Sequence, residues 1–110
     1  MQISKDAIIP ESKLTHYLLV FKAENDKSKF LAQAGFVRAN VGALQSAIRE
    51  LVDTNEAIED GINEYGTFYR VAGSLTAIRR KSLSVVTIWL QRKADSQFWF
   101  VTLKPYREIR

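Results

Sequence analysis

The chain has 110 residues, of which 46% are hydrophobic and 25% are charged, and its formal net charge is +4 at pH 7. These values fit one folded domain, residues 1–110, rather than a disordered segment. There is no cysteine, which excludes disulfides, thiolate metal ligands and cysteine nucleophiles. No apolar run approaches the ~20 residues of a membrane helix, and we recognise no signal peptide, so we expect a cytoplasmic protein without membrane contact.

Two short helices are predicted near the start of the chain. Residues 14–18 place two leucines and a tyrosine at helical spacing. Residues 25–26, Asn and Asp, are typical of a helix start. Gly35 stands where a glycine ends a helix, and Phe36 is expected to fold back as the hydrophobic contact of that cap.

The third predicted helix has the most regular pattern. It starts at Asn40 and ends near residues 53–55, and its apolar side chains recur at the spacing of a helix with one buried face. The following residues, 50–64, hold six acidic side chains and no Lys or Arg. We interpret them as a polar, acidic connection that turns at Gly61 and leads to a sheet.

Three runs rich in β-branched and aromatic residues predict strands: Thr67 to Ile78, Leu83 to Gln91, and Phe98 to Leu103. The links between them are short, so we expect hairpins and an antiparallel meander. The second run is apolar on both faces, which indicates a central strand. Residues 3–9 offer a further edge strand, and Gly73 indicates a bulge or a close backbone approach.

Strands that follow helices are typical of an α+β fold. We expect the N-terminal helices, about residues 10–55, to pack on one face of a C-terminal antiparallel β-meander of three to four strands, about residues 65–105. The other face of the sheet is then free to form a cleft or an interface.

The meander predicts a pole of positive charge. The end of the last strand lies beside the start of the second, which gathers six cations next to Tyr106: Arg79, Arg80, Lys81, Lys104, Arg107 and Arg110. Such a pole favours binding of phosphate or nucleic acid. The alternative is a solvated hairpin end whose charges protect a sheet edge.

Candidate catalytic residues are few. His16 is the single histidine and is a candidate general acid or base, although a surface histidine without a role is the alternative. Tyr69 is a second candidate for acid or base work, next to Arg70, whose guanidinium would stabilise charge on a phosphate.

The strands also carry polar and aromatic candidates for a binding surface. Thr87 and Trp89 share a strand face, and Thr102 is expected opposite Thr87 on the neighbouring strand, so the three residues are candidates for ligand binding on the sheet. The alternative is that Thr and Trp are simply good strand formers. We find no metal-ligand spacing and no glycine-rich phosphate loop, so we expect neither a metal nor a cofactor.

Several short segments carry a resemblance to a known family: residues 13–19, Lys29-Phe30 with Gly35-Phe36, Tyr65-Gly66-Thr67, Val86-Thr87-Ile88-Trp89, and Val101-Thr102-Leu103-Lys104-Pro105. Over nearly the whole chain they resemble the bacterial, often cyanobacterial, domain of unknown function 6883. The resemblance implies a small protein partner, because such domains are often encoded beside a second small protein. It also implies toxin-like relatives, and the helix-then-sheet order is that of the barnase/RelE-like ribonuclease toxins.

Two functions follow from these observations. The first is a small interaction module that binds a small protein partner, or forms a homodimer, through an uncovered sheet face that includes Trp89 and Trp99. The alternative is a ribonuclease-like toxin or nucleic-acid binder whose basic pole holds RNA. A flat, apolar sheet face favours the module, and a polar, concave face with His16 or Tyr69 near Arg70 favours the nuclease.

Overall fold

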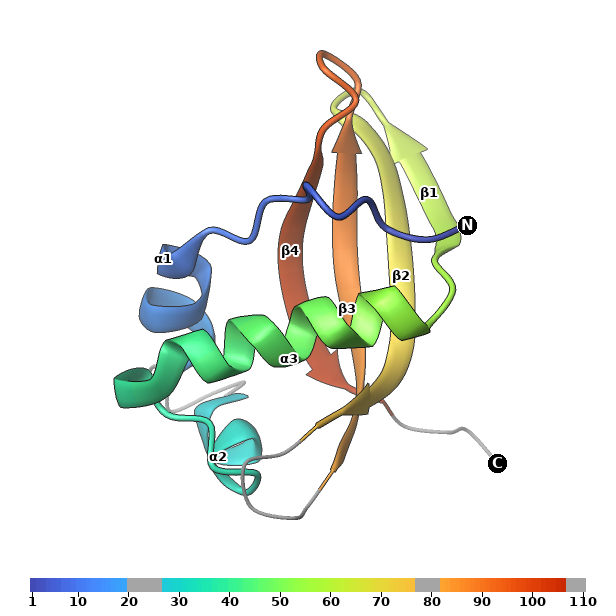
Figure 1. Ribbon diagram of the computed structural model, residues 1–110. Coiled ribbons are helices and arrows are strands. Elements are labelled where there is room, and N and C mark those ends of the chain that lie inside the picture. The colour runs from blue at the N-terminus through green and yellow to red at the C-terminus, as the bar shows by residue number, and fades with distance from the viewer. Residues whose placement is uncertain (20–26, 77–81, 107–110) are drawn as a thin grey trace.

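The computed structural model describes residues 1–19, 27–76 and 82–106. Its longest helix, Val41–Thr54, lies across one face of a four-stranded antiparallel sheet, and the shorter helices are drawn to the left of the strands (Figure 1). Helices followed by an antiparallel sheet confirm the predicted α+β fold. The helical elements are α1 (Glu11–Lys13), η1 (Leu14–Leu18), α2 (Lys27–Ala32), η2 (Arg38–Asn40) and α3 (Val41–Thr54). The strands are β1 (Ile58–Asn63), β2 (Gly66–Leu75), β3 (Leu83–Arg92) and β4 (Phe98–Pro105).

The sheet is the predicted meander. Its strand order is β1-β2-β3-β4, and each strand is antiparallel to its neighbours. β3 pairs with β2 and β4, as its apolar character on both faces predicted. The β3–β4 register shifts by one residue at Ile88 and Trp89, and such a β-bulge rotates one strand relative to its partner.

The strand β1 was not predicted from the sequence. It occupies residues 58–63, inside the segment that we interpreted as an acidic connection, so the sheet starts before residue 65. Gly61 is a strand residue with φ of +144° next to a bulge, and it is not the turn. All six residues of β1 are exposed, so no alternation of burial distinguishes this strand in the sequence. Its extended conformation comes from pairing with β2.

The strand expected at residues 3–9 does not form. Instead, Ile8 makes an isolated parallel bridge to Trp99 on the outer edge of β4. The Ile8 N–H donates to the carbonyl of Phe98 at 2.8 Å, and the Ile8 carbonyl accepts from the N–H of Phe100 at 2.8 Å. From there the N-terminal segment crosses the helix side of the sheet towards β1 (Figure 1).

The predicted cap of the second helix is confirmed. Gly35 follows α2 with φ of +93°, a conformation that favours glycine. Its N–H donates to the Ala32 carbonyl at 2.9 Å, and the N–H of Phe36 donates to the Leu31 carbonyl at 3.1 Å. This pair of bonds is a Schellman motif, and the Phe36 ring is buried against the core as expected. The predicted start at residues 25–26 lies outside the described residues.

The helix α3 lies across the sheet and supplies much of the core (Figure 1). It buries the apolar face that its sequence predicted: Leu44, Ala47, Ile48, Leu51 and Val52. Each large aliphatic side chain buried in this way contributes about 1.5–3 kcal/mol. In the described ranges, no helix is both long and apolar enough to cross a membrane.

The end of α3 is fitted closely to β2. Asn55 donates from Nδ2 to the Leu51 carbonyl at 2.8 Å and thereby caps the helix. A Cβ atom on Gly73 would lie 2.6 Å from that Nδ2 atom. Gly73 pairs with Val85 in an uninterrupted register, so it marks no bulge, and the group that approaches it is the side chain of Asn55 and not a backbone, as the sequence had suggested.

Candidate interaction surface on the open sheet face

The sheet has one face under the helices and one face that points away from them. We call the second the open face, since no helix covers it in the part of the chain that the structure describes (Figure 1). Side chains alternate along each strand, so the register assigns them to faces. The open face carries Ile58, Phe68, Arg70, Ala72, Val86, Ile88, Leu90, Arg92, Trp99, Thr102 and Lys104.

The centre of the open face is apolar. The register pairs Phe68 with Leu90 and Leu90 with Trp99, which sets three large apolar side chains in a row across three strands. Ile88 lies two residues from Leu90 on the same face, and all four side chains are half-buried. A contiguous group of half-exposed aromatic and aliphatic side chains is typical of a protein-binding surface.

A stacked pair occupies one end of this row. The guanidinium carbon of Arg92 lies 4.6 Å from the centre of the Trp99 ring, a cation–π arrangement. Asp95, in the β3–β4 turn, accepts from Arg92 Nε at 3.3 Å and also from Nη2. The hydrogen bonds from Arg92, together with one from the Gln97 backbone N–H, lower the pKa of Asp95 below its ordinary value of 3.8. The carboxylate thus holds the guanidinium over the indole ring.

The indole N–H of Trp99 is buried, and no described residue accepts a hydrogen bond from it. Such a group costs about 1–3 kcal/mol, and folded proteins contain few of them. Trp and Arg are also the residue types most enriched among the positions that dominate binding energy in interfaces. The pair of Trp99 and Arg92 is therefore the strongest candidate for the centre of a binding site.

Ion pairs neutralise most of the charge on the open face. Arg70 Nη1 donates to Asp60 Oδ1 at 3.1 Å, and Arg92 is paired with Asp95. Lys104 is exposed and has no ion pair among the described residues. The open face is consequently an apolar surface with paired charges at its rim, and its described part is not strongly basic.

The structure corrects the sheet-face site proposed from the sequence. Thr87 and Trp89 lie on the helix side and are completely buried, so solvent does not reach them. Trp89 donates from Nε1 to Thr87 Oγ1 at 2.9 Å, and Thr87 Oγ1 donates to the Val71 carbonyl at 3.1 Å. Thr102 pairs with Ile88 on the open face and does not face Thr87. The surface aromatic residue that the sequence offered was Trp99 and not Trp89.

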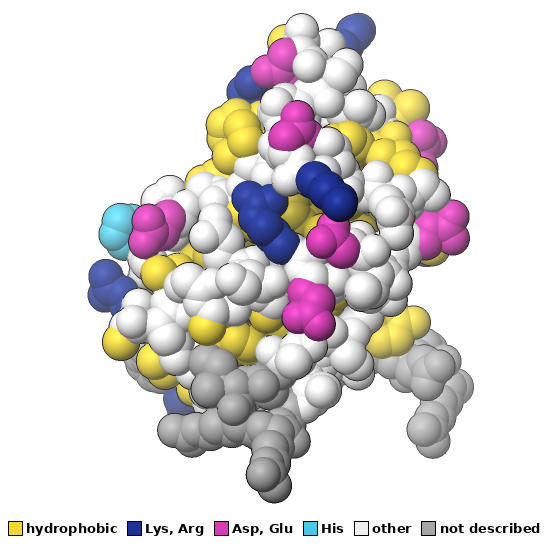
Figure 2. All heavy atoms as spheres, in the orientation of Figure 1, with side chains coloured by type: hydrophobic (Ala, Val, Ile, Leu, Met, Phe, Trp, Pro, Cys, Tyr) yellow, Lys and Arg dark blue, Asp and Glu magenta, His cyan; other side chains and the backbone are white. Residues whose placement is uncertain are grey.

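The candidate catalytic residues point in different directions. Tyr69 faces the helix side, where its ring packs 5.6 Å from that of Phe98, whereas Arg70 lies on the open face. His16 is exposed on η1, and the single cyan side chain in Figure 2 lies at the left margin, beyond β4. The described residues also contain no group of three His, Cys, Asp or Glu side chains that would hold a metal.

Most of the predicted basic pole lies outside the described residues. This holds for Arg79, Arg80, Lys81, Arg107 and Arg110. Lys104 is described, and it pairs with Val86 near the start of β3, as the meander predicted. Phosphate binding at the pole stays a prediction from the sequence.

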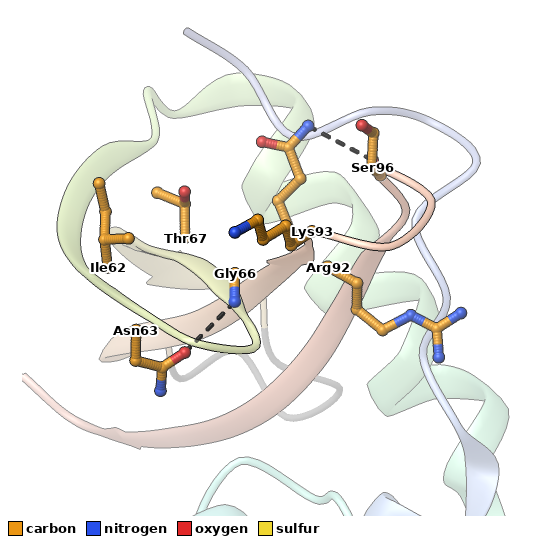
Figure 3. Close-up of a pocket in the computed structure, with 8 residues that line it drawn as sticks. Ile62, Asn63, Gly66, Thr67, Arg92, Lys93 and Ser96 are labelled. Atoms are coloured by element: carbon orange, nitrogen blue, oxygen red, sulfur yellow. Dashed lines mark hydrogen bonds between the residues drawn. The ribbon is translucent and has the colours of Figure 1, made fainter.

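A hollow of about 380 Å³ lies at the tips of the two hairpins β1–β2 and β3–β4 (Figure 3). Its lining is polar apart from one isoleucine and a glycine: Ile62, Asn63, Gly66, Thr67, Gln91, Arg92, Lys93 and Ser96. Lys93 runs towards Thr67, while the side chain of Arg92 leads away from the hollow (Figure 3). Among the described residues, its lining includes neither a carboxylate nor a histidine.

Comparisons with known proteins agree with the fold. The model of one family, described as Domain of unknown function (DUF6883), matches residues 2–107. The structure is similar to a chain of a solved contact-dependent growth inhibition toxin–immunity protein complex from Klebsiella pneumoniae 342. The TM-score is 0.71 at 14% identity, over 94% of this chain and 96% of that one. The likeness shows a shared fold. No curated protein matches the sequence.

Proposed function

This chain belongs to the DUF6883 family, and we propose that it is a protein-binding module of the toxin–immunity kind, which contacts a small protein partner through its open face. The observation that carries the proposal is the stacked pair of Trp99 and Arg92 beside the apolar row of Phe68 and Leu90. A partner that buries this row would remove apolar surface from water.

The fold comparison supports a protein partner, because the similar chain comes from a complex of two proteins. The composition of the open face supports the same reading. Aromatic and aliphatic side chains occupy its centre, and the ion pairs of Arg70 and Arg92 lie at the rim, which is the usual anatomy of an interface. A small partner is also what the family resemblance implied.

The ribonuclease alternative has less support among the described residues. A nuclease needs acid and base groups near a cation that stabilises the phosphate. His16, Tyr69 and Arg70 lie on different faces or elements, and Arg70 is already paired with Asp60. The nuclease therefore remains the outcome to be tested against the binding module.

The test is to express the chain with the small protein encoded next to it and to determine the mass of the complex by light scattering. We expect a complex that Trp99→Ala weakens by roughly 30-fold or more, the effect of losing a dominant interface residue. Val37→Ala is the matched control, because Val37 is an exposed apolar residue on the helix side, at 45% exposure.

Circular dichroism of both variants verifies that they are folded. A chain that dimerises alone, and becomes monomeric with Trp99→Ala, also supports binding through the open face. If the chain forms no complex and no dimer, or if Trp99→Ala binds like the unaltered chain, the proposal is wrong. Cleavage of RNA by the purified chain would support the nuclease instead.

A further inference from the structure

The strand β1 presents a second surface, distinct from the open face. It is an edge strand of the sheet, and its outer side has no neighbouring strand in the described residues. All six of its residues are exposed. An exposed edge offers backbone N–H and C=O groups with which a further strand can pair. The opposite edge of the sheet is already occupied in part, since Ile8 bridges to β4.

Large apolar side chains stand out from this edge. Ile58 is 52% exposed and Ile62 is 72% exposed, and Tyr65 in the following turn is 66% exposed. Ile58 pairs with Arg70 on the open face, whereas Ile62 pairs with Thr67 on the helix side. An added strand would therefore find one isoleucine on each face of the sheet, to be covered by its own alternating side chains.

The charge of the edge is negative. Figure 2 shows acidic side chains along the right margin, where β1 lies in Figure 1. Glu59 and Glu64 are exposed and have no ion pair among the described residues, while Asp60 is paired with Arg70. Sheet edges are commonly protected by lysine. Here the charges are carboxylates, which attract a basic segment.

We propose that the edge of β1 binds an extended, basic segment of the protein partner, which adds a fifth strand to the sheet. The inference rests on the proposed function and names the chemistry of the partner. The charges favour this occupant over a second copy of the chain, because pairing β1 with itself would bring its unpaired carboxylates together. The bulge at Glu59 and Gly61 interrupts the edge, so the added strand is short.

The test uses a short, capped peptide of alternating lysine and valine, followed by NMR and amide hydrogen exchange. We expect protection of backbone amides in residues 58–63, and binding that weakens as salt rises. A peptide of alternating glutamate and valine is the control and should not bind. If the lysine peptide protects no amide of β1, the proposal is overturned.

Charge reversal provides the second arm. Glu59→Lys combined with Glu64→Lys should weaken peptide binding about tenfold, since two attractive contacts become repulsive. The matched control is Glu11→Lys, an exposed residue of α1 on the far side of the sheet. Equal binding by the double variant and the control would contradict the proposal, as would a dimer that forms through β1.

The two proposals fail in distinguishable ways. Trp99→Ala should leave peptide binding at β1 intact and weaken only the complex with the partner protein. If the partner complex depends on Trp99 but does not respond to reversal at Glu59 and Glu64, the edge proposal is wrong and the open-face proposal stands. If the peptide binds β1 but no partner complex forms, the open-face proposal is wrong, whereas the capacity of the β1 edge to bind a basic strand is supported.

Discussion

The hydroxyl of Thr87 is the polar group on which the centre of the core depends. It accepts from the indole N–H of Trp89 at 2.9 Å and donates to the Val71 carbonyl at 3.1 Å, and both side chains are completely buried. Thr87→Val keeps the shape of the side chain and removes this hydroxyl. The substitution therefore tests whether the bond network stabilises the fold.

The magnitude follows from three contributions. The lost hydrogen bond to the Val71 carbonyl costs about 1 kcal/mol, and the indole N–H of Trp89, buried without its acceptor, costs about 1–3 kcal/mol. A buried methyl in place of the hydroxyl returns about 0.8 kcal/mol. We expect Thr87→Val to lower the free energy of unfolding by roughly 1–3 kcal/mol, a large part of the 5–15 kcal/mol typical of a domain.

A double-mutant cycle isolates the role of the indole N–H. Trp89→Phe removes the indole N–H, so Thr87→Val in that background leaves no indole N–H without an acceptor. The loss of unfolding free energy caused by Thr87→Val should then be about 1–3 kcal/mol smaller than in the unaltered chain. Urea unfolding followed by far-ultraviolet circular dichroism measures all four proteins. Equal costs of Thr87→Val in both backgrounds would refute the reasoning.

Three further outcomes are expected. Gly66→Ala should destabilise the fold by about 3 kcal/mol or more in a urea titration, since its Cβ would lie 2.0 Å from the Gln91 carbonyl oxygen at a φ of +154°, and a stable variant would contradict this geometry. Gly73→Ala should cost about 1–3 kcal/mol by crowding the amide that ends α3, and an unchanged midpoint would argue against that crowding. The bonds that lower the pKa of Asp95 stabilise the fold at pH values above the ordinary pKa of the carboxyl group. This stabilisation is lost as the pH falls through the lowered pKa, because the carboxylate becomes protonated. An NMR titration should show the Asp95 pKa rising towards 3.8 in Arg92→Ala, and an unchanged pKa would mean that the guanidinium is not its cause.

Elements with a one-sided apolar pattern were predictable from the sequence. The helix α3 buries the face that its spacing indicated, and Gly35 ends α2 as its conformational freedom predicted. The strand β1 was missed for a physical reason. Its six residues are exposed, and three of them are Glu59, Asp60 and Gly61, which are poor strand formers. Its structure is a tertiary effect of pairing with β2.

The candidate site was harder to predict, because β3 is apolar on both faces. Periodicity alone does not say which face the helices cover, so Trp89 was placed on the wrong side. The register contributed a second error. If the pairing of Leu90 with Trp99 continued without interruption, Thr102 would face Thr87, but the bulge shifts it to Ile88. No glycine or proline marks that bulge in the sequence.

Binding at the open face, at the edge of β1 and at the basic pole should differ in its response to salt. The open face is apolar, and its two arginines are already paired, so a complex formed there should change little with ionic strength. Binding at the acidic edge should weaken as the Debye length falls below about 10 Å, near 0.1 M salt. Binding of single-stranded RNA should fall more steeply, with a slope of roughly −0.7 per neutralised phosphate in log affinity against log salt. A salt titration of the partner complex, repeated with Trp99→Ala and with the reversal of Glu59 and Glu64, therefore assigns the binding energy to the open face or to the β1 edge. A steep loss that neither variant alters would point to the basic pole.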